Sequence, residues 1–329
     1  MVRGFECTGA AIAEAASEAC FNSRMQTNAS HTQGRALTTA AFATLLLIAA
    51  MMGANHVAAR LAFDHGVDVV TAVVVRSTVT ALVVGTLLLM SPVAVRLQRR
   101  QRLGLVAIGS LIAVQSVCLY SAVARLPVAL ALLAFNTYPL WTALWARLAY
   151  GHRPERRTVM AMPVILVGLA LALDVFGAAS GLGAAAQWQQ IGVGVAFALA
   201  AAATFGLALV LTQHEAGDLD GRLRTAATMS IVALLAVIVA TARGGLHLPN
   251  APVGWFGLAA LTFLYGTAIT ILFTVLPRLG VVGNSAIMNV EPIFALVLAW
   301  AILGQTVAAV QVVGGLIVVA MVVWLGLRR

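Results

Sequence analysis

The sequence predicts an all-α integral membrane protein with ten transmembrane helices, arranged as two inverted five-helix repeats. Three observations support this prediction: a shortage of charge, a series of apolar runs of membrane-spanning length, and a pattern that recurs at a constant offset of 153 residues. Hydrophobic types make up 61% of the 329 residues and charged types only 9%. A soluble chain of this size carries far more charge on its surface, so we expect lipid as the surrounding solvent.

Ten apolar segments follow a polar, Ala-rich stretch at the N-terminus. A membrane span needs about 20 apolar residues, and the segments repeatedly meet that length. They are expected at residues 40–61, 68–90, 104–124, 126–149, 158–174, 190–212, 225–242, 254–276, 281–303 and 307–327. Residues 1–37 are expected to form a cytoplasmic tail, residues 38–178 the first five-helix repeat, and residues 188–329 the second.

All 20 basic residues are arginines, and their placement predicts the orientation of the chain. With the N-terminus in the cytoplasm, 15 arginines fall in inside segments and only Arg125 and Arg243 in outside loops, as the positive-inside rule requires. The other three, Arg60, Arg76 and Arg147, fall within spans. Both termini are therefore expected in the cytoplasm. The Arg-only, Ala-rich composition suggests a GC-rich bacterial genome and thus the inner, cytoplasmic membrane.

The same composition argues against several other classes of protein. Without lysine the chain can form neither a P-loop nor a Schiff base, so ATP-driven pumping by this chain is not expected. The three cysteines have no metal-ligand spacing, and the sequence has neither hydrolase motifs nor paired intramembrane acids. We therefore expect no enzyme activity, no cofactor and no metal site. The net charge of +9 is assigned to membrane orientation rather than to nucleic acid.

The two halves of the chain share residues at the offset of 153 without any gap. The matches that argue most strongly against coincidence are Gly53 with Gly206, Ser77 with Ser230, Arg125-Leu126 with Arg278-Leu279, Asn136 with Asn289, Pro139 with Pro292, Ala146 with Ala299, and Gly151 with Gly304. Each half has five expected helices, an odd number, so the second half enters the membrane from the opposite side. Such inverted repeats are typical of secondary transporters.

Several local patterns resemble those of a known family. The most specific is Asn-Val-Glu-Pro at 289–292, followed by an apolar stretch from 295 that ends at Gly304. Its first-half counterpart is Thr-Tyr-Pro at 137–139, followed by a stretch that ends at Gly151. The family pattern is also matched by Arg76, Gln311 and Gly314-Gly315. Over residues 38–327 the chain resembles the EamA-type transporters of the drug/metabolite transporter superfamily. The resemblance implies ten helices around a central cavity and the export of small metabolites.

The chain departs from that family at a few helix ends. His152 and Gln305 stand where the family usually has an acid after the glycine that closes helices four and nine. Met52-Gly53 replaces a common Trp-Gly pair in the first helix. These differences bear on the choice of subfamily rather than on the fold.

Glu291 is the only acid well inside any expected helix. A charge at the bilayer centre costs about 2.5–3.5 kcal/mol on insertion scales, which makes such residues functional candidates. Glu291 lies near the midpoint of 281–303 and precedes Pro292, which frees a backbone carbonyl and bends the helix. A carboxyl group in apolar surroundings resists ionisation, so Glu291 is a candidate proton carrier. The alternative is a structural residue that bonds the broken backbone.

Tyr138 occupies the position equivalent to Glu291 in the first half and is expected near the same central region. Its hydroxyl needs a ligand or a neighbouring carbonyl as partner. Arg76 has three interpretations: it binds a substrate carboxylate, it pairs with Glu291, or it snorkels outward along its own stem. Arg147, near the cytoplasmic end of helix four, is expected to snorkel.

Five weaker candidates complete the predicted substrate and proton pathway. His56 shares a helix face with Arg60 and either exchanges protons or bonds a backbone group. The remaining candidates are Asn136 and Asn289, expected to satisfy backbone groups at the two breaks, and Gln115 and Tyr265, expected to line the cavity.

Together these features predict a secondary transporter that exports a small organic metabolite, driven by protons or by exchange. An amphipathic or amino-acid-like, zwitterionic solute suits a cavity with Arg76, Glu291 and Tyr138 among apolar walls. A passive channel or facilitator is the main alternative, and a membrane-embedded enzyme ranks last. The expected partners are the solute and the lipid bilayer, with the protein a monomer or a homodimer.

Overall fold

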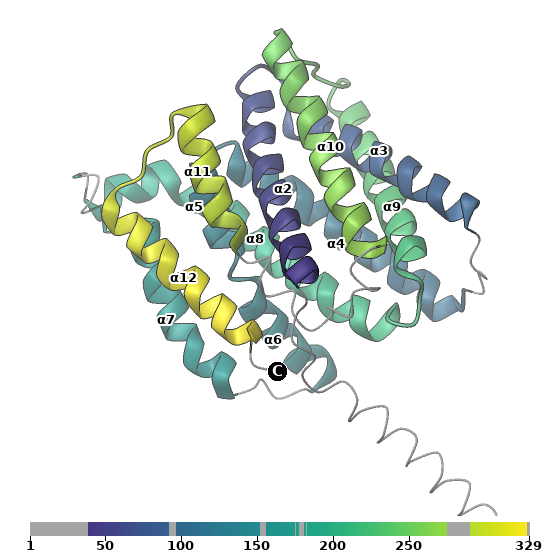
Figure 1. Cartoon of the computed structure of the whole chain (residues 1–329), viewed down its shortest axis with the longest axis horizontal. Helices are drawn as coiled ribbons and strands as arrows, with labels where there is room; N and C mark the ends of the chain where they lie inside the picture. The colour runs from purple at the N-terminus through teal and green to yellow at the C-terminus, as the bar shows by residue number, and fades with distance from the viewer. Residues whose placement is uncertain are drawn as a thin grey trace, which may run out of the picture. The chain divides into compact units, whose positions relative to one another are not determined.

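Within the computed structural model of the chain, residues 39–91, 97–151, 156–174, 176–177, 181, 183–274 and 290–327 are described. Every regular element in these ranges is a helix, which confirms the all-α prediction for them. The first half contains α2 (Thr39–Phe63), α3 (Val69–Met90), α4 (Arg99–Val123), α5 (Val128–Phe135), α6 (Tyr138–Tyr150) and α7 (Arg156–Ala172) (Figure 1). The second contains α8 (Ala184–Glu215), α9 (Gly221–Ala242), α10 (Pro252–Thr274), α11 (Glu291–Leu303) and α12 (Ala309–Leu327).

Helices of membrane-spanning length and composition occur seven times in the described residues, with α5 and α6 counted together as the segment Val128–Tyr150. The apolar helices α7, α11 and α12 are shorter. Each of the ten expected segments thus contains at least one helix. For the expected segment 281–303, residues 281–289 lie outside the described residues.

The break expected near Pro139 is present, and it divides the expected segment 126–149 into two helices. α5 ends at Phe135, Asn136 caps it, and α6 starts again at Tyr138 with Pro139 in its first turn. Proline has no N–H to donate and its ring clashes with the carbonyl four residues earlier, so a helix cannot run through it undisturbed. In the first turn of a new helix neither problem arises.

Three pairs of helices from the two halves begin at equivalent positions. α4 and α10 begin at 99 and 252, α6 and α11 at 138 and 291, and α7 and α12 at 156 and 309; each difference is 153. The helices α6 and α11 also end alike, at Gly151 with φ 69° and Gly304 with φ 64°. Both glycines adopt the left-handed conformation that side chains disfavour.

Two glycines show that contacts are exchanged between the halves. A Cβ atom on Gly53 in α2 would lie 3.0 Å from the backbone nitrogen of Ala295 in α11. A Cβ atom on Gly206 in α8 would lie 2.8 Å from the backbone nitrogen of Thr142 in α6. Because 206 − 53 and 295 − 142 both equal 153, the two contacts are equivalent and reciprocal. The first helix of each half packs against the other half.

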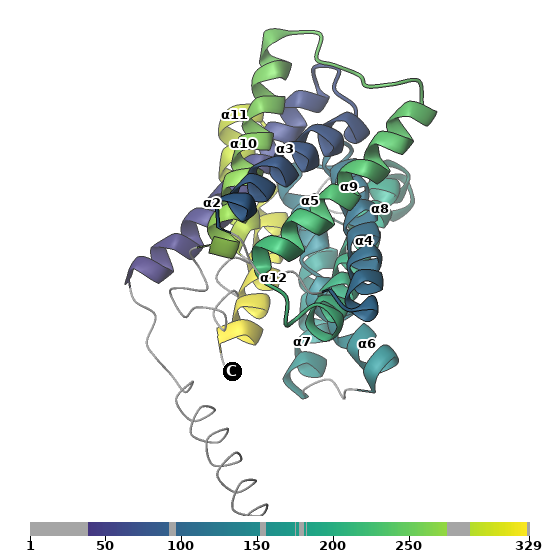
Figure 2. The same cartoon turned by 90° about the vertical axis from the view of Figure 1, so that its right-hand side faces the viewer.

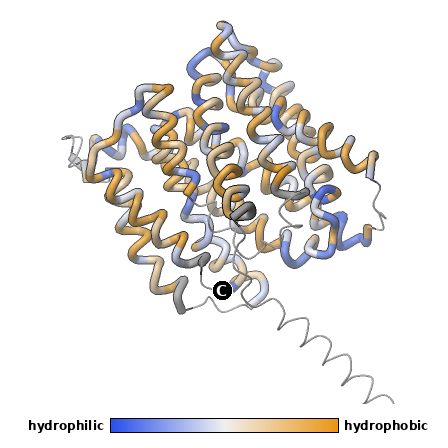
Figure 3. Tube along the Cα trace, in the orientation of Figure 1, coloured by the Kyte–Doolittle hydropathy of each residue, from blue (hydrophilic) through white to orange (hydrophobic). Residues whose placement is uncertain are grey.

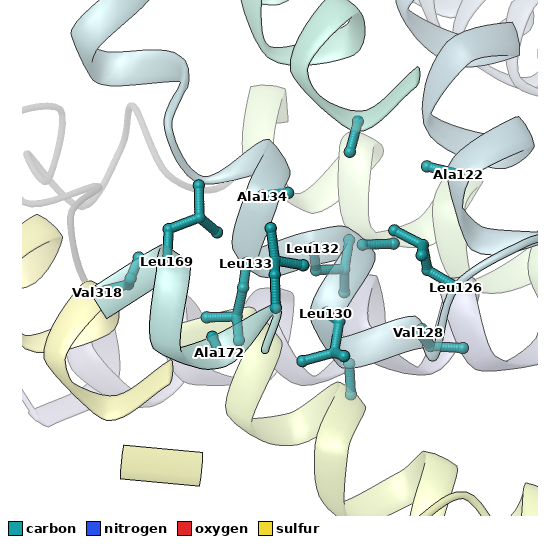
Figure 4. Close-up of a cluster of buried hydrophobic side chains, with 14 of the residues drawn as sticks. Ala122, Leu126, Val128, Leu130, Leu132, Leu133, Ala134, Leu169, Ala172 and Val318 are labelled. Carbon is teal, nitrogen blue, oxygen red and sulfur yellow. The ribbon is translucent and has the colours of Figure 1, made fainter. Parts of the chain in front are cut away.

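Further contacts between halves join α4 to α8, α3 to α9, and α7 to α12. Figures 1 and 2 show α3 beside α9, and Figure 1 shows α12 along α7. The short helix α5 lies at the centre of the largest core, and its residues from Val128 to Ala134 are all buried (Figure 4). A helix that is apolar on every side is suited to such a position.

The outer surface of the helices is apolar as well. Leu82, Leu89 and Phe263 are 65%, 82% and 68% exposed, and apolar residues recur along most of the helices in Figure 3. Exposed apolar surface of this extent is typical of proteins whose surroundings are lipid. The described helices are therefore those of a multi-pass membrane protein.

Candidate functional site

Arg76 is the centre of a polar network inside the apolar bundle. It lies in the middle of α3, and its side chain is 4% exposed. Its Nη1 donates to the Tyr120 hydroxyl at 3.1 Å and its Nη2 to Ser116 Oγ at 2.8 Å. The guanidinium carbon also lies 3.9 Å from the ring centroid of Tyr265 and 4.8 Å from that of Tyr120. Two hydroxyls and two aromatic rings thus surround this cation.

Tyr120 extends the network to α2. Its side chain is fully buried, and its hydroxyl donates to Asn55 Oδ1 at 3.1 Å while it accepts from Arg76. Ser116 precedes Tyr120 by one helical turn on α4, and its hydroxyl donates to Gln115 Oε1 at 3.4 Å. The network therefore joins α2, α3 and α4 of the first half to Tyr265 in α10 of the second.

Glu291 and His56 form a second polar pair next to this network. Glu291 Oε1 lies 3.3 Å from Nε2 of His56, whose side chain is 3% exposed. Glu291 is the first residue of α11, where the unpaired N–H groups of the helix favour a negative group. The His56 ring contacts the Tyr120 ring edge-on, with 5.8 Å between centroids. Glu291, His56, Tyr120 and Arg76 therefore form one continuous chain of contacts.

Three side-chain nitrogen atoms of this cluster are buried and have no hydrogen-bond partner among the described residues. They are Asn55 Nδ2, His56 Nδ1 and Arg76 Nε. A buried polar group without a partner costs about 1–3 kcal/mol. Such atoms are frequent where a ligand or a moving group completes the site.

The remaining predicted residues lie in other surroundings. Tyr138 packs against the rings of Phe135 and Phe205, at centroid distances of 5.7 and 5.2 Å. Asn136 is buried at the break, and its Nδ2 has no partner in the described part of the chain. Asn289 lies outside the described residues. Arg147 is exposed near the end of α6.

The structure narrows the three interpretations of Arg76. Its burial excludes outward snorkelling in this conformation, and the described residues show no ion pair between Arg76 and Glu291. The sequence analysis missed Asn55, Ser116 and Tyr120, each of which is neutral and common in apolar helices. The available signals were spacing and adjacency, because Ser116 and Tyr120 are four residues apart and Asn55 is next to His56.

Two open cavities lie near the ends of the helices. One, of about 600 Å³, is lined by Arg99, Arg100, Leu103, Gly104, Ala107, Leu211 and Glu215. Beside it, Glu215 accepts from Arg100 at 2.5 and 2.9 Å and from the Tyr150 hydroxyl at 3.0 Å. The other cavity, of about 520 Å³, lies among the ends of α2 and α4, the start of α3 and the residue after α9, and its lining includes Phe63, Ser121 and Arg243. This second cavity is the nearer to the polar network along α4, since Ser121 follows Tyr120.

Comparison with known proteins places this geometry in context. The model of the EamA-like transporter family matches the chain twice, at residues 39–173 and 192–327. The threonine/homoserine exporter RhtA of Salmonella typhimurium, strains SL1344 and LT2, is 26% identical over 254 residues, which cover 71% of this chain and 76% of the exporter. A solved structure, described only as the crystal structure of a protein, matches with a TM-score of 0.57. It is 17% identical and covers 86% of this chain and 95% of that chain, so it bears on the fold alone.

Proposed function

Since the chain belongs to the EamA-like transporter family, within the drug/metabolite transporter superfamily, we propose that it is a secondary active exporter of a small amino-acid-like metabolite. The family and the relatives are transporters rather than enzymes. RhtA is 26% identical to this chain over most of its length, and its name describes it as an exporter of threonine and homoserine. That similarity and the polar network inside the bundle support a small polar solute.

We extend the proposal to ten membrane-crossing helices in two inverted repeats, with both termini in the cytoplasm of a bacterial inner membrane. The reciprocal contacts of Gly53 and Gly206 support a two-fold relation between the halves. Contacts between helix ends also support the predicted side of the membrane for each loop. Arg100 contacts Glu215, both expected inside, and the Asn250 N–H bonds the His65 carbonyl, both expected outside.

The orientation is tested by labelling single cysteines in a variant that lacks the three natural ones. A cysteine at Leu246, exposed between α9 and α10, should react with a membrane-impermeant thiol reagent from outside intact cells. A cysteine at Asp218, exposed between α8 and α9, should react only after the membrane is opened. The reverse pattern of labelling would contradict the proposed orientation.

The single observation that carries the coupling proposal is the Glu291–His56 contact of 3.3 Å. A partly exposed carboxyl group beside a buried imidazole can take up a proton in one conformation and release it in another. If the solute binds when Glu291 is deprotonated, proton and solute compete for one site, and export is coupled to proton entry. Rocking of one repeat against the other would expose the site alternately to each side.

This proposal is tested with the full-length protein in proteoliposomes under an imposed pH gradient, in a solute screen that begins with L-threonine and L-homoserine. We expect saturable, uphill transport. Glu291→Gln keeps the shape and loses the titrating group, so it should abolish uphill transport and retain solute exchange. Asp218→Asn, at an exposed loop acid, is the matched control. Uphill transport by Glu291→Gln at the wild-type rate would refute coupling through Glu291, and unsaturable flux without coupling would indicate a facilitator.

A further inference from the structure

Arg76 differs from the other arginines whose side chains the structure describes. It is the only one of them that is buried. Acid partners within 4 Å occur for three of the others, in the pairs Arg60–Asp64, Arg100–Glu215 and Arg222–Asp220. Among the described residues no carboxylate pairs with Arg76. A buried charge without a counter-charge is costly, and the nearby aromatic rings offset only part of that cost.

The stretch of sequence that leads to α11 contains no possible counter-ion either. The sequence has no Asp or Glu at residues 275–289, the stretch that leads to α11. Glu291, the one acid well inside an expected span, contacts His56 instead.

The fold itself does not require a cation at this place. The position equivalent to Arg76 in the second half, 153 residues later, is Met229, which is buried in α9. α3 and α9 pack against each other and carry these two side chains at equivalent positions. A packing role is therefore filled by a neutral side chain of similar length in the other half, which leaves the charge of Arg76 to be explained by function.

Some of the hydrogen-bond donors at and around Arg76 also lack an acceptor in the described residues. Arg76 Nε and Asn55 Nδ2 are buried without partners in the described residues, and both side chains bond the Tyr120 hydroxyl. A carboxylate accepts about four hydrogen bonds and binds a guanidinium by two parallel N–H bonds. Arg76 could offer Nε and Nη2 in that geometry if Ser116 yields its bond.

We infer that Arg76, assisted by Asn55, binds the carboxylate of the transported solute, an inference that rests on the proposed function. Glu291 lies beyond His56 and Tyr120 in the same chain of contacts, so the two charges do not pair and the guanidinium can take an anionic group of the solute. The substrate class is therefore small amino-acid-like solutes with a free carboxylate.

Access to this site is closed in the described conformation. Tyr120 is fully buried, and its ring packs against Phe63 at 5.7 Å between centroids. Phe63 lines the 520 Å³ cavity, so Tyr120 contacts both the cavity wall and the guanidinium of Arg76. A solute would reach Arg76 from this cavity only after the Tyr120 and Phe63 side chains separate.

The test measures binding to the full-length protein in detergent, by calorimetry. A panel of common L-amino acids and L-homoserine is followed by the carboxamide of the tightest binder, which keeps the ammonium group and lacks the carboxylate charge. We expect the carboxamide to bind the wild type at least about tenfold more weakly, because a hydrogen bond to a charged group is lost. Phosphatidylglycerol is the anion that a bilayer could supply instead, and it should not compete.

Two variants assign the preference to Arg76. Arg76→Met introduces the residue found at the equivalent position, so it should fold, bind the carboxylate weakly and lose the discrimination against the carboxamide. Arg76→Lys should keep the discrimination with weaker binding, and it provides a second measurement should Arg76→Met fail to fold. Arg147→Met, at an exposed arginine near the end of α6, is the matched control and should bind like the wild type.

Failure of this inference can be distinguished from failure of the proposed function. Equal binding of the carboxamide by the wild type, no binding of any carboxylate, or binding of phosphatidylglycerol alone would overturn the role of Arg76, even if vesicles export a neutral solute or an amine. If the wild type binds the carboxylate more tightly than the carboxamide and Arg76→Met does not, this result would support the carboxylate site, even if no uphill transport is found.

Discussion

The helices α6 and α11 start with the same backbone and lie in different surroundings. Thr137 and Val290 have similar dihedral angles, and α6 and α11 begin one residue later with proline in the first turn. At the start of α6 Tyr138 lies against Phe135 and Phe205, whereas at the start of α11 Glu291 contacts His56. Proline and glycine thus recur at the same positions of both helices, while the side chains around their starts have diverged.

The divergence extends to the whole polar network. Its first-half members are Asn55, His56, Arg76, Gln115, Ser116 and Tyr120, and the residues 153 positions later are Ala208, Leu209, Met229, Ala268, Ile269 and Phe273. None of these six counterparts carries a charge. The comparison shows that a repeated scaffold can hold a single, asymmetric site, with most of its polar groups from one half and its acid from the other.

The largest expected effect comes from a substitution that makes the surroundings of Glu291, at the start of α11, as apolar as those of Tyr138, at the start of α6. His56→Leu introduces the side chain of the equivalent Leu209 and removes a contact of Glu291. Hydrogen bonds to charged groups contribute about 1.5–3 kcal/mol, so uphill transport in proteoliposomes should fall at least about tenfold. Leu209→Met is the control and should transport normally. Transport by His56→Leu at the wild-type rate would show that the difference between the surroundings of Tyr138 and Glu291 is unrelated to coupling.

A second test concerns the contacts that the halves share. Gly53→Val and Gly206→Val each push a side chain into the backbone of α11 or α6, and overpacking of this kind costs about 1–3 kcal/mol. Both variants should unfold at lower temperature in detergent. Gly85→Ala, at a site with no neighbour within 4 Å, should be neutral or stabilising. A large loss for only one of the two valine variants would mean that the contacts are not equivalent.

A smaller and equal effect is expected where α6 and α11 end. Gly151 and Gly304 both have positive φ and no heavy atom near the place of a Cβ. Alanine at either position meets only the backbone cost of the left-handed conformation, about 1–2 kcal/mol. Thermal unfolding of Gly151→Ala and Gly304→Ala should therefore show similar losses, and unequal losses would reveal different constraints on the two helix ends.

The smallest effect is expected at the aromatic break. Tyr138→Phe retains the ring that packs against Phe135 and Phe205 and should transport like the wild type. Tyr138→Leu loses the ring contacts, which contribute about 0.5–1.5 kcal/mol per aromatic pair, and should lower stability while transport is retained. If Tyr138→Phe abolishes uphill transport, the hydroxyl has a role comparable to that of Glu291.

The elements of the fold were largely predictable, because hydropathy marks long helices and a constant offset marks a repeat. Pro139 and Pro292 also indicated disturbed helices, and at Pro139 the structure has the separate helices α5 and α6. Hydropathy alone does not reveal this division, since the whole segment Val128–Tyr150 is long and apolar enough to cross a membrane. The short α5 is distinguished by its wholly apolar sequence and by the burial of its residues from Val128 to Ala134.

The site was less predictable, because its contacts are distant in sequence. His56 and Glu291 are 235 residues apart (291 − 56), and each was selected alone as a polar residue within an expected span. Their pairing needs the packing of α2 against α11. Tyr120 was missed because its importance depends on Asn55 and His56 in α2 and Arg76 in α3, and none of them is visible from its neighbours in sequence.

The exchanged glycine contacts also set the order in which the protein can be assembled during synthesis. When Gly206 emerges, its partner Thr142 has already been made, so α8 can dock at once. Gly53 must wait for Ala295, 242 residues later (295 − 53), or about 12–48 seconds at 5–20 residues per second. During that interval the face of α2 around Gly53 has no α11 to pack against, and the Glu291–His56 contact does not exist. A nascent chain stopped before α11 should therefore hold α8 in place and leave the Gly53 face of α2 uncovered.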